Sequence, residues 1–205
     1  MFDAILVAFY ACSRRIVGLV NRPYETYRAM MEKSSLWELF PLGVLVGLYL
    51  AISSLVKTAA FRPFVLTRHF IKTSGSVVVT FLFVTVLLWG VARLWGGRGA
   101  YKHIVLGWAY TLIPTCCWFF FTSILYMVLP PPRTTQMTGV SLSVVFLTIS
   151  AVLLFWKIIL GYLTLRFGMK MDLVKILLTV CVVAPIIGLY SVGMYRLGIF
   201  RIPFL

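Results

Sequence analysis

Five apolar runs without a charged residue constrain this chain more than any other feature of its sequence. They cover residues 39–56, 73–92, 104–132, 134–156 and 176–195. A hydrocarbon core about 30 Å thick requires about 20 apolar residues of helix, which these runs supply. The runs do not alternate in polarity as barrel strands do, and a helix satisfies its own backbone hydrogen bonds in lipid. Helices are therefore the expected spanning elements.

The expected fold is an all-α integral membrane protein with five transmembrane helices, preceded by short interfacial amphipathic helices. Apolar residues make up 61% of the chain and charged residues only 12%, about half the charged fraction of a typical soluble domain. The apolar pattern resumes directly after Lys157, so we extend the fourth span past this lysine. An interfacial segment at 1–36 is expected to precede a transmembrane domain at 37–205. The predicted spans of this domain lie near residues 37–56, 74–95, 104–130, 141–166 and 174–196.

The first 36 residues are expected to lie on the membrane, because apolar residues there are flanked by arginines. We assign three of these arginines to anionic lipid headgroups: Arg14, Arg15 and Arg22. The basic pair follows the first apolar stretch instead of preceding it, so a cleaved signal peptide is not expected. Asn21 is expected to cap a second short helix with Pro23 in its first turn.

The sequence Ser35-Leu36-Trp37-Glu38 has the pattern of a capping box and directly precedes the first apolar run. In this interpretation the Ser35 side chain caps the helix and Glu38 has a structural role at the start of the first span.

The net charge of +14 points to lipid headgroups as the ionic partner. The 19 Lys and Arg residues are spread over every loop, so nucleic acid is not an expected partner and anionic lipids are. With five spans, eleven of these residues fall on the side of the N-terminus and seven on the other side. The positive-inside rule then places the N-terminus in the cytoplasm and the C-terminus outside.

Glycine and proline positions within the spans suggest packing sites and kinks. Gly43 and Gly47 form a pair of small residues, four apart, that would let another helix approach closely. Pro41, Pro114 and Pro185 are candidate kinks of the first, third and fifth spans. Packing and gating remain alternative roles for these kinks.

No set of residues indicates catalysis, a metal site or a cofactor. The chain has five acids and two histidines, and His69 and His103 are predicted on opposite sides of the membrane. The turn Gly96-Gly97-Arg98-Gly99 lacks the spacing of a nucleotide-binding loop. The four cysteines have no ligand spacing and are interpreted as small apolar residues. We therefore expect a protein that is not an enzyme.

Lys157 lies well inside the fourth predicted span, nine residues before Arg166 at the end of that span. A charge near mid-bilayer costs at least a few kcal/mol, so the ammonium must reach the headgroups, pair with an acid or line a polar cavity. Extension to a lipid phosphate is one interpretation and a functional cation facing a partner is the other. No acid in a neighbouring span can be named as its counter-ion.

The order of these features resembles the Yip1 family of five-span membrane proteins. Residues 22–27 (RPYETY) are similar to the family's P-x-x-[TS]-[FWY] approach to the first span. Residues 96–102, followed by Gly107, Tyr110 and Pro114, resemble its glycine-rich turn and its Y-x-x-x-P third span. The short N-terminal region is similar to that of bacterial members, which implies a bacterial inner membrane protein. Family members have the N-terminus in the cytoplasm and the C-terminus outside, which agrees with the charge count.

The leading hypothesis is a non-enzymatic integral membrane subunit or accessory protein that packs laterally against partner membrane proteins. Bacterial members include accessories to export machinery, which makes an export or other multi-subunit membrane complex the expected setting. The alternative is a small transporter or channel with Lys157 in the pathway. A regulator that acts through its basic N-terminal helix is a third interpretation.

Overall fold

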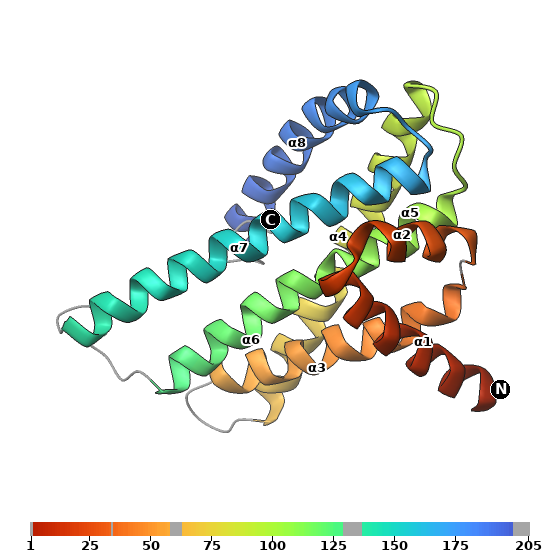
Figure 1. Ribbon diagram of the computed structural model, residues 1–205. Coiled ribbons are helices and arrows are strands. Elements are labelled where there is room, and N and C mark those ends of the chain that lie inside the picture. Colours follow the sequence, from red (N-terminus) through yellow and green to blue (C-terminus); the bar gives the residue numbers. More distant parts are fainter. Residues whose placement is uncertain (1, 34, 58–62, 129–136, 199–205) are drawn as a thin grey trace.

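The computed structural model describes residues 2–33, 35–57, 63–128 and 137–198, and every regular element in these ranges is helical (Figure 1). The elements are α1 (Phe2–Asn21), α2 (Pro23–Glu32), the short 3₁₀ helix η1 (Leu36–Glu38), α3 (Leu39–Lys57), α4 (Pro63–Leu94), α5 (Tyr101–Tyr110), α6 (Leu112–Val128), α7 (Met137–Gly168) and α8 (Leu173–Arg196).

Five stretches of helix in the described residues are long and apolar enough to cross a membrane. They are Leu36–Ser54, Thr67–Leu94, Tyr101–Leu125, Gly139–Gly168 and Leu173–Arg196. The prediction of an all-α integral membrane protein with five spans is confirmed. The third stretch is the most enclosed, with 56% of its apolar window buried, whereas the corresponding value for the fourth is 6%.

The third span is divided into α5 and α6 at Thr111, three residues before Pro114. The Thr111 N–H donates to the carbonyls of both Gly107 and Trp108, and its hydroxyl donates to the Trp108 carbonyl across 2.7 Å. These bonds close the last turn of α5. Proline has no N–H, so Pro114 cannot donate to the Tyr110 carbonyl, and the helical ladder is interrupted next to the break between α5 and α6. Pro185 lies inside α8, which runs past it without interruption, and Pro41 lies in the first turn of α3, where helices tolerate proline.

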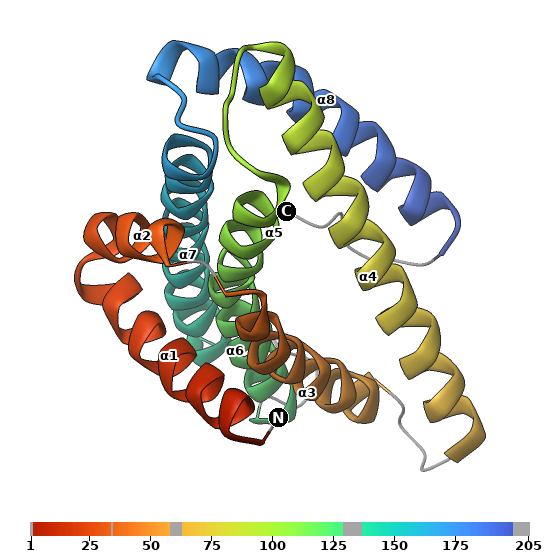
Figure 2. The ribbon, with the colours of Figure 1, turned by 90° about the vertical axis from the view of Figure 1, so that its right-hand side faces the viewer.

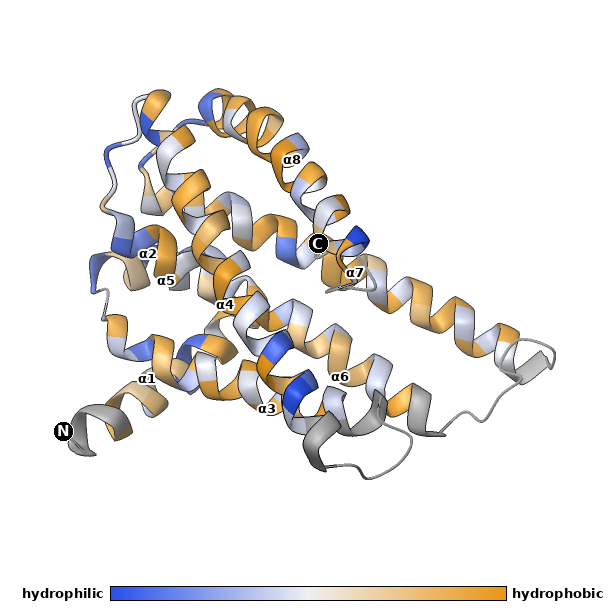
Figure 3. Ribbon diagram, turned by 180° about the vertical axis from the view of Figure 1, so that it is seen from behind, coloured by the Kyte–Doolittle hydropathy of each residue, from blue (hydrophilic) through white to orange (hydrophobic). Residues whose placement is uncertain are grey.

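The spans form two groups, one of α3, α5, α6 and α7 and the other of α4 and α8, and α3 and α5 contact α4 between the groups. The α5–α6 helices pack on α7, α3 packs on both α6 and α4, and α8 packs chiefly on α4. Figure 2 shows α4 and α8 running side by side and diverging from the α6 and α7 pair. The spans are mainly hydrophobic along their length, and hydrophilic residues are more frequent near their ends (Figure 3). Large apolar side chains are exposed on all five spans. This distribution fits a bilayer around the helices.

Glycines let the loop before α5 contact the loop after α7. The Arg98 N–H donates to the Met169 carbonyl across 3.0 Å. A Cβ atom at Gly99 would overlap the backbone carbonyl of Gly168, and one at Gly97 would lie 2.8 Å from the carbonyl oxygen of Ala92. The glycine-rich turn is therefore a packing requirement, since any side chain at Gly99 would separate the two loops.

Two capping predictions were wrong. Asn21 is the last residue of α1, and Arg22 occupies the N-cap of α2 without a side-chain hydrogen bond. Ser35 precedes η1 and also makes no side-chain cap bond. The Glu38 carboxylate is turned into the bundle instead, where it has stronger partners than a backbone N–H.

Candidate functional site

Glu38 lies at the centre of a polar network that joins α1 to the spans. Its side chain is only 2% exposed, and Oε2 accepts a hydrogen bond from the Tyr110 hydroxyl across 2.7 Å. The same oxygen forms an ion pair with Nη1 of Arg15, whose Nη2 donates to the Lys33 carbonyl across 3.2 Å. Arg15, which the sequence analysis assigned to lipid headgroups, is thus bonded within the protein.

Cys12 lies on the same buried face of α1, four percent exposed. Burial raises the pKa of its thiol, and a hydrogen bond with Tyr110 opposes that shift only in part. The thiol is therefore protonated at neutral pH and packs as a small apolar group. Cys116 is buried as well, whereas Cys117 and Cys181 are exposed, so the expectation of buried cysteines holds for two of the four.

Tyr27 attaches α2 to the bundle in a comparable way. Its fully buried hydroxyl donates to the Gly107 carbonyl across 3.0 Å and accepts from the Thr164 hydroxyl across 3.4 Å. Burial raises the pKa of Tyr27 well above its ordinary value. A Cβ at Gly107 would lie 2.7 Å from Cγ2 of Thr164 and 2.9 Å from Cε of Met31. Glycine at this position therefore permits the close contact of α2, α5 and α7.

The docked α1 still presents an apolar face away from the bundle. Ala8, Cys12 and Leu19 are buried, while the opposite face carries exposed large apolar side chains: Leu6, Val7, Tyr10, Val17 and Val20. One apolar face of α1 therefore packs against the protein, and the other leaves apolar side chains exposed on the surface.

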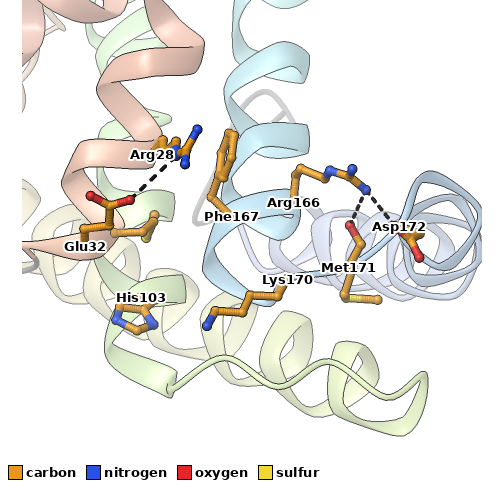
Figure 4. Close-up of a pocket in the computed structure, with 9 residues that line it drawn as sticks. Arg28, Glu32, His103, Arg166, Phe167, Lys170, Met171 and Asp172 are labelled. Atoms are coloured by element: carbon orange, nitrogen blue, oxygen red, sulfur yellow. Dashed lines mark hydrogen bonds and ion pairs between the residues drawn. The ribbon is translucent and has the colours of Figure 1, made fainter.

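A cavity of about 500 Å³ lies between α2, α5 and the end of α7 (Figure 4). Its polar lining consists of Arg28, Glu32, His103, Arg166, Lys170 and Asp172. Arg28 Nε lies 3.6 Å from Glu32 Oε1 along α2. Arg166 Nη1 donates to Asp172 Oδ1 across 2.9 Å and to the Met171 carbonyl across 3.0 Å.

Lys170 differs from the two arginines because the described residues offer it no acid partner. It extends toward His103 in Figure 4, and its charge acts on that ring. Its backbone φ is +55°, which makes it the one non-glycine residue with positive φ in the described chain. A lysine in this left-handed conformation costs about 1–2 kcal/mol relative to the right-handed one.

Every acid whose side chain the structure describes is paired with an arginine. The pairs are Glu25 with Arg22, Glu32 with Arg28, Glu38 with Arg15, and Asp172 with Arg166. The lysines around the cavity end of the bundle therefore carry positive charge that no described carboxylate neutralises. Lys102, Lys170 and Lys175 are all exposed there.

The family model described as "Yip1 domain" matches residues 17–195, which is most of the chain. The chain belongs to the Yip1 family. Comparison with curated proteins and with solved structures found no match. The Yip1 match begins inside α1 and ends one residue before the end of α8, so it includes the Arg22–Tyr27 approach, the glycine-rich loop and all five spans.

The Yip1 motif residues that supported the resemblance meet in the structure. Tyr27, Gly107 and Tyr110 lie at the junction of the N-terminal helices with the third span. Their helical spacing was readable from the sequence, but their bonding partners were not. Thr164 and the pairing of Arg15 with Glu38 were missed, since the partners are far apart along the chain and no local pattern links them.

Lys157 lies in the middle of α7 on the side of α6, within electrostatic reach of the buried Cys116. The structure describes no hydrogen bond or ion pair for its ammonium within the residues it covers.

The remaining site candidates face outward. A Cβ at Gly43 or Gly47 would meet no atom within 4 Å, so neither glycine contacts another described helix closely. Arg14 is exposed, and Arg22 is exposed in its pair with Glu25. Within the described part of the chain, no group of three His, Cys, Asp or Glu side chains is arranged to hold a metal ion.

Proposed function

We propose that this Yip1-family protein is a non-enzymatic accessory subunit that binds other membrane proteins laterally, in an export or other multi-subunit complex of a bacterial inner membrane. The observation that carries the proposal is Lys157. It stands in the least enclosed span, α7, and no acid among the described residues pairs with it. A cation at that depth requires a partner, and an acid on another membrane protein would supply one.

The outward-facing glycines support the same proposal. Gly43 and Gly47 leave a flat strip on α3, flanked by the exposed apolar residues Phe40, Val44 and Leu48. Helices associate in membranes through such strips because backbones can approach closely. The surface outside the spans consists mainly of α1, α2 and short connections, so binding in the membrane is the main interaction the shape allows.

Co-purification in mild detergent, followed by mass spectrometry, tests the proposal. If a partner acid faces Lys157, Lys157→Leu leaves that acid buried and unpaired, so the partner is lost. Lys157→Arg keeps the charge but not the compact geometry of an ammonium, so it should retain part of the yield. Lys72→Leu in α4 is a matched control, because this exposed lysine lies in the terminal part of its span.

Retention of every partner by both Lys157 variants, at the yield of the unchanged protein, would remove the functional-cation argument. Extension of the lysine to lipid phosphate would then account for its position.

A small transporter or channel with Lys157 in its pathway is the second candidate. The observation in its favour is the Thr115 hydroxyl in α6, one residue before Cys116, which is buried without a hydrogen-bond partner among the described residues. A polar pathway would require such groups. Transport that is abolished by Lys157→Leu while all partners are retained would favour this function over the accessory one.

A further inference from the structure

The cavity between α2, α5 and α7 lies at the ends of candidate membrane spans, where the headgroups of a bilayer around those spans would be found. Three predicted crossings begin or end beside it, at Tyr101, Gly168 and Leu173. Its volume of about 500 Å³ falls within the range of small-molecule sites. The phosphates of the surrounding lipids are therefore the anions present at the highest local concentration.

The cavity combines Lys170, which has no acid partner among the described residues, with Arg166, which is held in place by Asp172 and the Met171 carbonyl. The Lys170 ammonium extends along the wall toward His103 (Figure 4). Arg166 uses Nη1 for both of its protein bonds, which leaves the hydrogens on Nη2 and Nε for a ligand. We propose that this cavity binds the phosphate of an anionic glycerophospholipid, with Lys170 as the principal cation and Arg166 as a positioned donor.

The backbone at Lys170 gives independent support. Glycine adopts a φ of +55° without strain, whereas lysine does not. A lysine at position 170 therefore strains the backbone where a glycine would not. Its side chain lines the cavity and has no acid partner among the described residues. Residues held in such conformations are concentrated at ligand sites.

The remaining residues of the cavity wall fit the groups that adjoin a lipid phosphate. Met31, Phe167 and Met171 supply apolar atoms that can contact the glycerol and the first acyl carbons. The Arg28 to Glu32 pair is long at 3.6 Å and its side chains are 68% and 67% exposed. Such a surface pair is weak, so Arg28 can turn toward a phosphate at little cost.

Native mass spectrometry of the protein released from lipid nanodiscs can test the site. The discs contain either phosphatidylcholine alone or phosphatidylcholine with phosphatidylglycerol, and the signal is the fraction of protein that retains one phosphatidylglycerol. Lys170→Gly removes the cation and the backbone strain together, so the variant should be at least as stable as the unchanged protein. Its retention of phosphatidylglycerol should fall roughly ten-fold, the usual effect of one lost charge-assisted hydrogen bond.

The matched control is Lys175→Gln, which removes one exposed charge at the same end of the bundle without touching the cavity. It should change retention less than two-fold, as expected for a screened surface charge. Arg166→Gln provides a second test of the cavity and should reduce retention as Lys170→Gly does. An equal loss in Lys175→Gln and Lys170→Gly would overturn the proposal, because it would show a diffuse surface attraction.

Inorganic phosphate added to discs of phosphatidylcholine alone distinguishes the two sources of the anion. We expect inorganic phosphate to leave the melting temperature of the protein unchanged. Phosphatidylglycerol should raise the melting temperature of the unchanged protein but not that of Lys170→Gly. A rise with inorganic phosphate that matches the rise with phosphatidylglycerol would overturn the lipid assignment. The readout is separate from partner binding, so its failure would leave the accessory function intact.

Discussion

Glu38 Oε2 accepts a hydrogen bond from the Tyr110 hydroxyl, 2.7 Å away and 72 residues later in the sequence, and it also pairs with Arg15. One carboxylate oxygen therefore joins the N-terminal helix α1 to the start of the first span and to the third. Because the carboxylate is 2% exposed, both partners are required to offset the cost of its burial.

Glu38→Gln should destabilise the protein by roughly 2–4 kcal/mol, because it leaves the Arg15 guanidinium partly buried without its counter-ion. Tyr110→Phe removes the hydroxyl that bonds the Glu38 carboxylate and Cys12, and it should cost about 1.5–3 kcal/mol, the usual value for a hydrogen bond to a charged group. Thermal unfolding in detergent measures both. Arg22→Gln, which breaks an exposed ion pair, is the control and should cost less than about 1 kcal/mol. If Glu38→Gln proved no more harmful than Arg22→Gln, the network would not be what holds α1.

Gly107→Ala should destabilise the protein by about 1–3 kcal/mol, the usual cost of forcing an extra methyl group into a packed contact. The added Cβ would lie 2.7 Å from Thr164 and 2.9 Å from Met31, so α2 or α7 must move. The melting temperature in detergent is the measurement. Gly43→Ala is the matched control, since its Cβ would meet open space and alanine favours helix. A neutral Gly107→Ala would show that α2 is not closely packed on the bundle.

The five spans were predictable because length and lack of charge are local properties of the sequence. The cavity was not, since His103, Arg166 and Lys170 come together only when α5 and α7 pack side by side. Glu38 shows most clearly that a local sequence pattern does not predict a tertiary contact. Its sequence context matched a capping box, yet a buried carboxylate gains more from an arginine and a phenol than from one backbone N–H, so the tertiary contact decided its orientation.

The position of the N-terminal segment on the membrane surface stays a prediction, and the buried partner of Arg15 was missed. The alternation of apolar residues and arginines in this segment indicates an amphipathic helix on the membrane, and α1 does present an exposed apolar face. The same pattern does not indicate that Arg15 turns inward, because an arginine beside a lipid surface and one beside a distant glutamate look identical in sequence. The difference depends on where α3 places Glu38.

Tyr27→Phe should lower stability by about 1 kcal/mol at neutral pH, through loss of the bond to the Gly107 carbonyl. It should also change the alkaline limb of the pH profile. Since burial raises the pKa of Tyr27 in the folded state, the unfolded chain releases the proton first, from about pH 10 upward. Stability is therefore complete below that pH and falls as pH rises above it.

Thermal unfolding of the two proteins between neutral pH and about pH 11 checks this, a range that crosses the ordinary tyrosine pKa. The difference in melting temperature should shrink as pH rises, because the phenylalanine variant has no proton to lose at this position. A constant difference across the range would show that Tyr27 does not contribute to the alkaline loss.

The orientation of the protein in the membrane depends on the excess of cations at the end of the bundle that holds α2 and the cavity. In a cysteine-free background, with cysteine placed at Lys33 or at Leu197, an impermeant thiol reagent applied to intact cells should label only Leu197→Cys. Both positions are exposed, and α8 carries the chain from the α2 end of the bundle to the opposite end. The positive-inside rule retains the end that holds Lys33 in the cytoplasm. Labelling of Lys33→Cys alone would invert the orientation, and labelling of both positions would contradict an odd number of crossings between them.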